Sequence, residues 1–354
     1  MYFSENFIYE EILMEETTIK TENVHCLFCN EDSTVHLGSV YDMFTAQPGI
    51  FNLVQCRYCG LAYITPRPAK ESIGHYYSDY KEGKHFNMMK KLRGAEGIGK
   101  LLVRDRLTFL EKHVPLSSST RVLDVGCGLG SFLALLREKR GCQIYGVEYD
   151  PVACNYLEGI EGMQVKQGDL VDTHFEDDFF DVITLFAYLE HSFDPLQDLK
   201  EANRILKPGG IISINLPNFD FSMRKVFKKI WFIHGAPQHL YHFNASSLQL
   251  LLDRAGFQPL GKPYYPFTVL EVTTNLILLA FPGNNLTEFF LSKSYPVKVI
   301  LTSLVVLGGI LDFPVSLFLS MTHRSSRLAI FAKKKEDRSV FTESVLKVSM
   351  LTQS

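Results

Sequence analysis

The sequence predicts an α/β fold: a doubly wound and mostly parallel sheet, with a small unit ahead of it and an apolar insertion before its last strand. Three observations lead to this prediction. β-favouring runs alternate with helical patterns between residues 98 and 262, one run enters the glycine turn 122–130, and two cysteine pairs precede both. Ligands of such sheets bind outside the carboxyl ends of the strands.

Composition sets limits on the class of protein. The 354 residues leave room for a catalytic domain and a smaller unit. The 36 Lys and Arg residues stand against 39 Asp and Glu, so we expect no nucleic-acid partner. The acidic start of the chain does not resemble a signal peptide. Seven cysteines, an odd number, indicate reduced thiols and a metal site, and therefore a cytoplasmic protein.

Two CxxC pairs follow an expected leader over residues 1–22. The pairs are separated by 26 residues, the pattern of a tetrahedral four-thiolate zinc site in which each pair turns around the metal. A single redox dithiol would leave the second pair unexplained. The predicted ligands are Cys26, Cys29, Cys56 and Cys59. Because the protein fills all four positions, we expect the zinc to be structural, within a zinc ribbon over residues 23–69.

The segment VLDVGCGLG, residues 122–130, predicts a strand, a glycine turn and then a helix. Glycine lets the backbone turn tightly and lets a ligand approach without meeting a Cβ. Asp124 stands just ahead of the glycines, and a second strand ends on Glu148, where a carboxylate can bind both ribose hydroxyls of an adenosine. S-adenosylmethionine carries an ammonium and no phosphate, so an acid beside the loop suits it better than a dinucleotide.

This segment resembles the first motif of class I S-adenosylmethionine-dependent methyltransferases, and the later motifs follow in family order over the expected core, residues 98–262. The resemblance implies a seven-stranded, Rossmann-like sheet and S-adenosylmethionine as cofactor. It places Asp169 at the adenine amino group and the strand that ends at Phe186 beside the methyl-transfer site. The implied cofactor-binding residues are Asp124, Gly126, Cys127, Gly128, Gly130, Glu148, Asp169, Leu170 and Phe186.

The wording CRYCGLAYITPRP resembles the zinc ribbon ahead of many bacterial sugar-modifying methyltransferases. That resemblance implies methyl transfer to an acceptor of surface-glycan, sugar or lipid-linked metabolism. Two alternatives stay open. One is a small-molecule O-methyltransferase acting on a quinone-like or secondary-metabolite hydroxyl, and the other is a non-catalytic zinc-ribbon interaction protein that keeps the fold as a scaffold. The intact Asp124, Glu148 and Asp169 argue against the scaffold.

Candidate catalytic residues lie in two further segments. Residues 70–97 are tyrosine-rich, and in the resembled family such a helix covers cofactor and acceptor as a lid; an amphipathic linker helix is the alternative. Past the fifth strand, a predicted loop holds three histidines and a tyrosine within nine residues, and it resembles the family's segment of His, two residues and His-Phe. The candidates in these two segments are His239, His242 and Tyr76, with one histidine as general base. His191, after the fourth strand, is a further candidate whose role stays open, because in the resembled family the Glu-His pair at this place more often shapes the cofactor pocket.

Residues 263–326 are more apolar than a surface connection should be. Residues 299–321 are long enough to span a bilayer, but one span would separate the last core strand, 327–336, from its sheet. We therefore expect peripheral contact with the inner face of the membrane, through 263–321 and a basic aromatic helix over 223–232. The alternative is that these helices pack on one another or form a dimer face. A tail, 337–354, ends the chain.

Overall fold

The computed structural model describes residues 19–42, 47–77, 98–224, 235–266 and 295–335. Most of the expected leader, most of the lid segment, the basic helix beyond Arg224, the first part of the apolar insertion and the tail lie outside these residues. Arg224 itself packs over the Phe219 ring and donates a hydrogen bond to the Phe219 carbonyl oxygen at 2.8 Å. This basic side chain is therefore used in packing.

The main sheet has seven strands in the order β12-β13-β10-β9-β6-β7-β8. Among the described strands of this sheet, β13 points opposite to the other six, so the sheet is mostly parallel, as predicted. The strands are β6 (Arg121–Val125), β7 (Gln143–Glu148), β8 (Met163–Gln167), β9 (Phe180–Phe186), β10 (Leu206–Pro217), β12 (Phe257–Pro259) and β13 (Arg327–Lys334). The class predicted from the sequence is confirmed, and the last strand returns to the sheet after the insertion.

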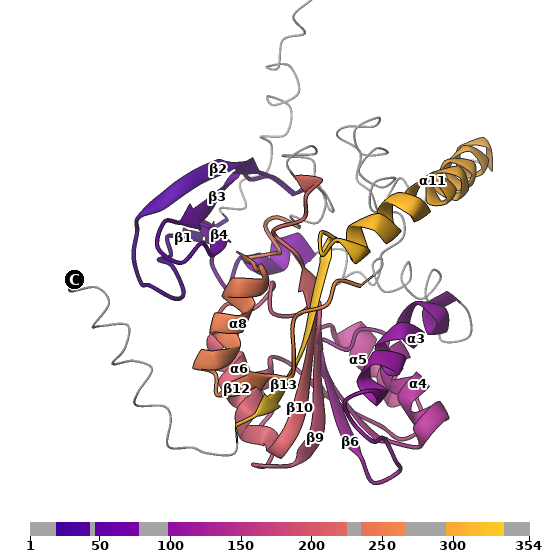
Figure 1. Cartoon of the computed structure of the whole chain (residues 1–354). Helices are drawn as coiled ribbons and strands as arrows, with labels where there is room; N and C mark the ends of the chain where they lie inside the picture. The colour runs from indigo at the N-terminus through magenta and orange to yellow at the C-terminus, as the bar shows by residue number, and fades with distance from the viewer. Residues whose placement is uncertain (1–18, 43–46, 78–97, 225–234, 267–294, 336–354) are drawn as a thin grey trace, which may run out of the picture.

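Helices cover both faces of this sheet (Figure 1). On one face lie α3 (Ile98–Glu111), α4 (Ser131–Arg140) and α5 (Pro151–Glu158), and on the other α6 (Pro195–Ile205) and α8 (Ala245–Arg254). A short helix, η2 (Leu170–Asp172), follows β8. Helix starts have local causes. The Asp150 and Asp194 side chains accept backbone hydrogen bonds ahead of a proline, and Asn244 forms a capping box with Ser247.

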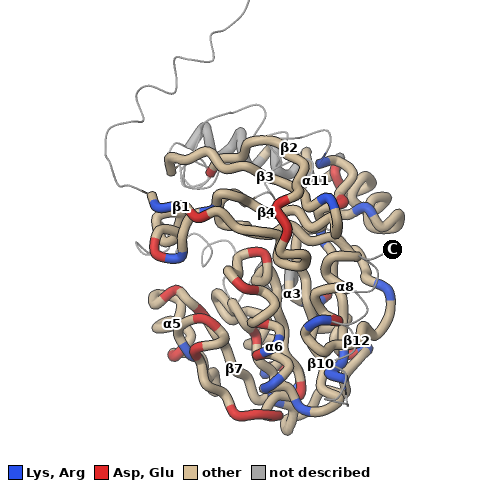
Figure 2. The backbone as a smooth tube through the Cα atoms, turned by 90° about the vertical axis from the view of Figure 1, so that its left-hand side faces the viewer, with Lys and Arg blue, Asp and Glu red and all other residues tan. Residues whose placement is uncertain are grey.

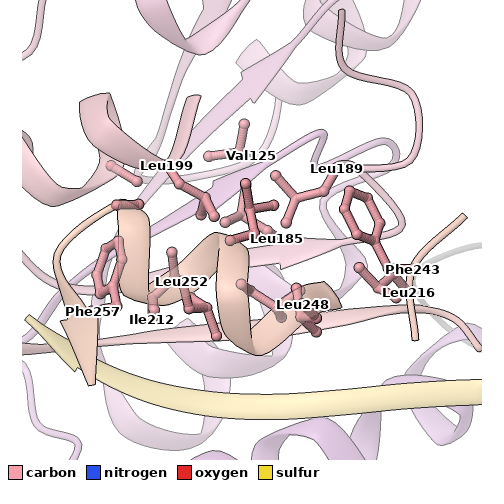
Figure 3. Packing of buried hydrophobic residues seen from close by; sticks show 14 of the residues in the cluster. Val125, Leu185, Leu189, Leu199, Ile212, Leu216, Phe243, Leu248, Leu252 and Phe257 are labelled. Atoms are coloured by element: carbon pink, nitrogen blue, oxygen red, sulfur yellow. The ribbon is translucent and has the colours of Figure 1, made fainter. Parts of the chain in front are cut away.

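Alternating strand residues divide the core into two layers. Val122 packs with residues of α3 and α4, whereas its neighbour Leu123 belongs to the cluster beneath α6 and α8. In that second layer, Leu248 and Leu252 of α8 point onto β10 (Figure 3). The same cluster includes Tyr63, from the N-terminal unit. The small unit and the main domain therefore share one hydrophobic core.

The N-terminal unit is built on a four-stranded antiparallel sheet in the order β11-β4-β3-β2. Three strands come from the unit itself: β2 (Thr34–Val40), β3 (Phe51–Cys56) and β4 (Ala62–Ile64). The fourth, β11 (Tyr241–His242), comes from the histidine-rich segment that was predicted to be a loop, and it pairs with Ala62 and Tyr63. The pair β1 (Thr21–Glu22) and β5 (Arg67–Pro68) and the short helix η1 (Ile73–Tyr77) complete the unit.

The described part of the apolar insertion is α11 (Tyr295–Met321), a 27-residue helix that extends away from the sheet before β13 begins (Figure 1). Near its end, Asp312 and Ser316 are buried and joined by a 3.0 Å hydrogen bond. Large apolar side chains of the helix are exposed, among them Leu307, Ile310, Phe313, Phe318 and Met321. Across the described ranges, none of the helices meets the length and apolarity needed to cross a bilayer.

Candidate functional site

The glycine turn joins β6 to α4 and has an open side. Gly126, Gly128 and Gly130 all have positive φ, at 71°, 56° and 65°. A Cβ on Gly130 would lie 2.5 Å from the Leu157 side chain, so this glycine is required by packing. A Cβ on Gly128 would meet nothing within 4 Å. The backbone at Gly128 is therefore the part of the turn that a ligand can approach.

Glu148 is fixed at the tip of β7 beside this turn. One carboxylate oxygen accepts a hydrogen bond from the Gly128 amide at 2.8 Å, and the other accepts from the Tyr149 and Asp150 amides at 2.9 Å. Burial raises the pKa of Glu148, and these amides offset part of the rise. A carboxylate has about four lone pairs and three of them accept amides here, so Glu148 can still accept one hydrogen bond from a ribose hydroxyl.

Asp124 lies beneath the turn, and Cys127 is part of it. The Asp124 carboxyl accepts a 2.6 Å hydrogen bond from the Thr184 hydroxyl, and burial raises its pKa to about 6. Burial also raises the pKa of the Cys127 thiol. Phe186, at the end of β9, packs edge-on against Phe132 with ring centroids 5.2 Å apart. Asp124, just ahead of the turn, is therefore held by the neighbouring strand β9.

Asp169 and Leu170 lie at the predicted adenine end. Leu170 is fully buried, whereas Asp169 forms a 2.9 Å ion pair with Lys70. Lys70 lies in the N-terminal unit, between β5 and η1, so that unit reaches the cofactor side of the domain. Taken together, the open glycine turn, the fixed Glu148 and the acid at the next strand end fit an adenosine with a charged, phosphate-free tail.

A second cluster, which we call the histidine group, consists of Glu190, His191 and His239. Each offers one ligand atom, and these atoms lie within 4.8 Å of one another. The two imidazole rings are perpendicular, with centroids 4.5 Å apart. Burial raises the pKa of Glu190 to about 7 and lowers that of His191 to about 4. A neutral His191 beside a buried carboxyl is therefore the expected state near neutral pH.

Backbone contacts hold the histidine group together. The Glu190 carbonyl oxygen accepts from the Leu240 amide at 2.7 Å, and the Leu240 carbonyl oxygen in turn accepts from Ile64 of β4 at 3.0 Å. The Tyr188 ring, two residues before Glu190, lies 3.2 Å from the Cβ position of Gly126. The group therefore lies at the same sheet edge as the glycine turn, and the N-terminal unit supports it from the opposite side.

Two other predicted catalytic residues lie beside this group. His242, in β11, is buried, with its ring centroid 6.5 Å from that of His239 and 5.8 Å from that of Phe219. Tyr76 is fully buried in the small unit, where its hydroxyl donates to the Pro48 carbonyl oxygen at 2.8 Å. The Tyr76 side chain therefore packs inside the small unit and does not point toward the histidine group.

Sequence reasoning missed two contributors to the histidine group. The Tyr77 hydroxyl lies 2.9 Å from Nδ1 of His191, so the tyrosine next to Tyr76 reaches the site. The backbone carbonyl oxygen of Gln238 lies 3.1 Å from the same ring nitrogen, and the Gln238 side-chain amide donates to the Tyr76 backbone carbonyl oxygen at 2.9 Å. The signal available for Tyr77 was the run of tyrosines at 76, 77 and 80; nothing in the sequence singled out Gln238.

The four cysteines of the CxxC pairs come together as predicted from their spacing. Their sulfur atoms lie within 4.8 Å of one another, and the Cys26 and Cys59 sulfurs are 3.3 Å apart. A tetrahedral zinc with Zn–S bonds of about 2.3 Å needs sulfurs roughly 3.8 Å apart, so the cluster fits zinc. The Cys59 hydrogen bond lowers the pKa of Cys26 to about 5. Arg254 of α8 donates to the Phe28 carbonyl oxygen at 2.7 Å and so ties this cluster to the main domain.

Comparison with known proteins agrees with this geometry. Residues 96–261 match a family described as "Methyltransferase domain". A Mycolicibacterium smegmatis protein named "Probable S-adenosylmethionine-dependent methyltransferase" is 29% identical over 143 residues, covering 39% of this chain and 51% of the relative. Demethylmenaquinone methyltransferase of Staphylococcus aureus is 33% identical over 110 residues, covering 28% of this chain and 44% of the relative. The chain thus spans about half the length of these curated relatives.

Two solved structures resemble this chain at low sequence identity. An S-adenosylmethionine-dependent methyltransferase from Archaeoglobus fulgidus is 23% identical, with a TM-score of 0.45, covering 71% of this chain and 99% of its own. The [4+2]-cyclase SpnF is 19% identical, with a TM-score of 0.48, covering 77% of this chain and 98% of its own. The sheet order and glycine turn seen here, with the family match, show that residues 96–261 are a class I S-adenosylmethionine-dependent methyltransferase domain.

Proposed function

We propose that the protein transfers the methyl group of S-adenosylmethionine to an acceptor bound at the histidine group. The observation that carries this proposal is the shared sheet edge: the open turn with Glu148 lies on it, and so do Glu190 and His191. Bound S-adenosylmethionine supplies a methyl group on an activated sulfonium. The remaining work is to align the acceptor and, for a hydroxyl, to remove its proton.

Different residues of the chain bind the cofactor, the zinc and the acceptor. The glycine turn, Glu148 and Asp169 bind the cofactor, and the four-cysteine cluster holds structural zinc. His239 and His242 face the acceptor, and one of them serves as the general base. An imidazole in its neutral form can accept a proton from a hydroxyl, and both rings are packed against other aromatic rings.

For the acceptor, we propose a sugar or lipid-linked glycan. The support is the resemblance of the zinc ribbon to those of sugar-modifying methyltransferases, together with the pairing of β4 with the histidine strand β11. A lipid-linked acceptor would bring the protein to a membrane surface, where the exposed apolar side chains of α11 supply a contact. Figure 2 shows Lys and Arg spread among Asp and Glu in the described chain, and we propose no nucleic-acid acceptor.

A quinone-like acceptor is the second candidate. It is favoured by the 33% identity to demethylmenaquinone methyltransferase, a protein whose name gives such a substrate. A quinone-like hydroxyl would use the same cofactor site and the same base. The two candidates therefore share the same cofactor chemistry, and only the identity of the methylated product distinguishes them.

Incubation with methyl-labelled S-adenosylmethionine and separated cell fractions tests the proposal. Label in a chloroform-extractable glycan or in a sugar nucleotide supports the first candidate. Label in an extracted quinone supports the second. A Glu148→Ala variant should label nothing. Cofactor binding without label in any fraction would favour the non-catalytic scaffold instead.

A further inference from the structure

Glu190 presents an unusual carboxyl. Its side chain is 2% exposed, and among the described residues neither carboxylate oxygen has a hydrogen-bond partner. An ionised carboxylate is costly to bury unless a cation or hydrogen-bond donors compensate it. The Glu190 backbone carbonyl, in contrast, accepts from the Leu240 and Tyr241 amides at 2.7 and 3.3 Å. The backbone of Glu190 is therefore held in place, while its carboxyl group has no hydrogen-bond partner among the described residues.

His191 lies next to this carboxyl, and two groups contact its Nδ1 atom. The Tyr77 hydroxyl lies 2.9 Å from Nδ1 and the Gln238 backbone carbonyl oxygen lies 3.1 Å from it, and a carbonyl oxygen can only accept a hydrogen bond. In the tautomer that donates to this carbonyl, the lone pair of the neutral ring is on Nε2. A histidine that binds a metal commonly donates its other N–H to a backbone carbonyl in this way.

His239 supplies the third donor. One donor atom from each of Glu190, His191 and His239 lies within 4.8 Å of the other two, a spacing that a single ion can bridge. Two imidazole nitrogens and one carboxylate oxygen form the donor set of sites that hold divalent transition metals and leave positions open for a substrate. The four-cysteine cluster differs, because its protein ligands complete a tetrahedron.

We propose that Glu190, His191 and His239 bind a divalent transition-metal ion at the methyl-acceptor site. This inference rests on the proposed function and refines it. A bound cation with open positions coordinates an acceptor oxygen and makes the loss of its proton easier, before that oxygen attacks the methyl group. The acceptor then carries a hydroxyl, preferably beside a second oxygen that completes a chelate. His239 becomes a metal ligand, and His242 remains to take the proton.

Co²⁺ added to the full chain, with zinc first loaded into the cysteine cluster, tests this assignment. We expect about one equivalent of Co²⁺ to give weak visible absorption without the strong charge-transfer bands of thiolate ligands. Glu190→Gln and His239→Asn should each raise the Co²⁺ dissociation constant at least about tenfold. Asp312→Asn, which changes a buried acid on α11, should leave that constant unchanged.

The absence of a Co²⁺ signal in the wild-type protein would overturn the metal site. An equal signal in Glu190→Gln, or bands of thiolate ligands alone, would overturn it too. Calorimetric titration of the same samples with S-adenosylmethionine separates the two proposals. Cofactor binding without Co²⁺ binding would support the proposed function and contradict the metal site. Co²⁺ binding without cofactor binding would support the metal site and contradict the proposed function.

Discussion

Asp124 is buried beneath the glycine turn, where its carboxyl accepts a hydrogen bond from the Thr184 hydroxyl. Burial raises its pKa from an ordinary value of 3.8 to about 6, so the folded protein holds this proton more tightly than the unfolded chain does. The stabilisation from the protonated form is therefore complete below about pH 4 and is lost as the pH rises through about 6. Above that range the ionised carboxylate is a cost to folding.

Asp124→Asn should consequently stabilise the fold more at neutral pH than at acidic pH. The gain over the wild type should grow by about 2 kcal/mol between roughly pH 4 and pH 7, because the amide cannot ionise. Urea unfolding of both proteins at the two pH values measures this difference. A gain that is the same at both values would show that the carboxyl titrates normally.

Arg67 joins the small unit to the histidine strand. Its side chain donates to Glu22 at 2.7 Å and to the Phe193 carbonyl oxygen and the Tyr241 hydroxyl at 3.3 Å. Arg67→Lys keeps the charge but loses the planar set of donors, so we expect the free energy of unfolding to fall by about 1–3 kcal/mol. Arg57→Lys, on an exposed part of the same unit, should change it by less than about 0.5 kcal/mol. Equal effects in denaturant titrations would contradict this role.

Among the elements, the two-residue strand β11 connects the two parts of the molecule. It joins the histidine group to the cysteine-bearing sheet. No local pattern predicts it, because its partner β4 lies far away in sequence and pairing is decided by tertiary contacts. Cys56 of the cysteine cluster and Tyr63 of β4 belong to the same hydrophobic core as Tyr241 of β11. Loss of zinc should therefore reach the acceptor site through β4.

Cys59→Ala tests this coupling. We expect methyl transfer to fall by up to about 100-fold as the histidines shift, while the affinity for S-adenosylmethionine changes little. Cys142→Ala removes a buried sulfur outside the cluster and should retain activity. Single-turnover rates and calorimetric cofactor titrations supply the two readouts. Parallel loss of cofactor binding would indicate general unfolding, and full activity would show that the zinc unit is independent of the site.

The exposed face of α11 carries the prediction of membrane contact. Phe313→Ser with Phe318→Ser should lower the fraction that floats with anionic liposomes at least about tenfold, because two large apolar side chains leave the interface. Ile50→Ser with Tyr58→Ser changes exposed apolar residues of the small unit and should have no effect. Equal losses in both variants, or no flotation of the wild type, would favour packing against another protein surface.

At the scale of the whole molecule, local chemistry was the part that the sequence could predict. The glycine turn, Glu148 and the cysteine pairs depend on backbone geometry or ligand spacing within short segments. The alternating elements predict a mostly parallel sheet, and the number of seven strands comes from the family resemblance. The histidine group depends on contacts between distant segments. Its buried Glu190, its Tyr77 contact and the orientation of Tyr76 toward Pro48 appear only once the two parts share a core.

The measurement that tests the central claim most directly is calorimetric titration of the full chain with S-adenosylmethionine. We expect binding of one equivalent, with Glu148→Ala weakening it at least about tenfold because the ribose loses its acceptor. Glu158→Ala, at the end of α5, serves as the matched control and should bind as the wild type does. No heat of binding for the wild type, or equal affinity in Glu148→Ala, would contradict the account of this domain as a methyltransferase.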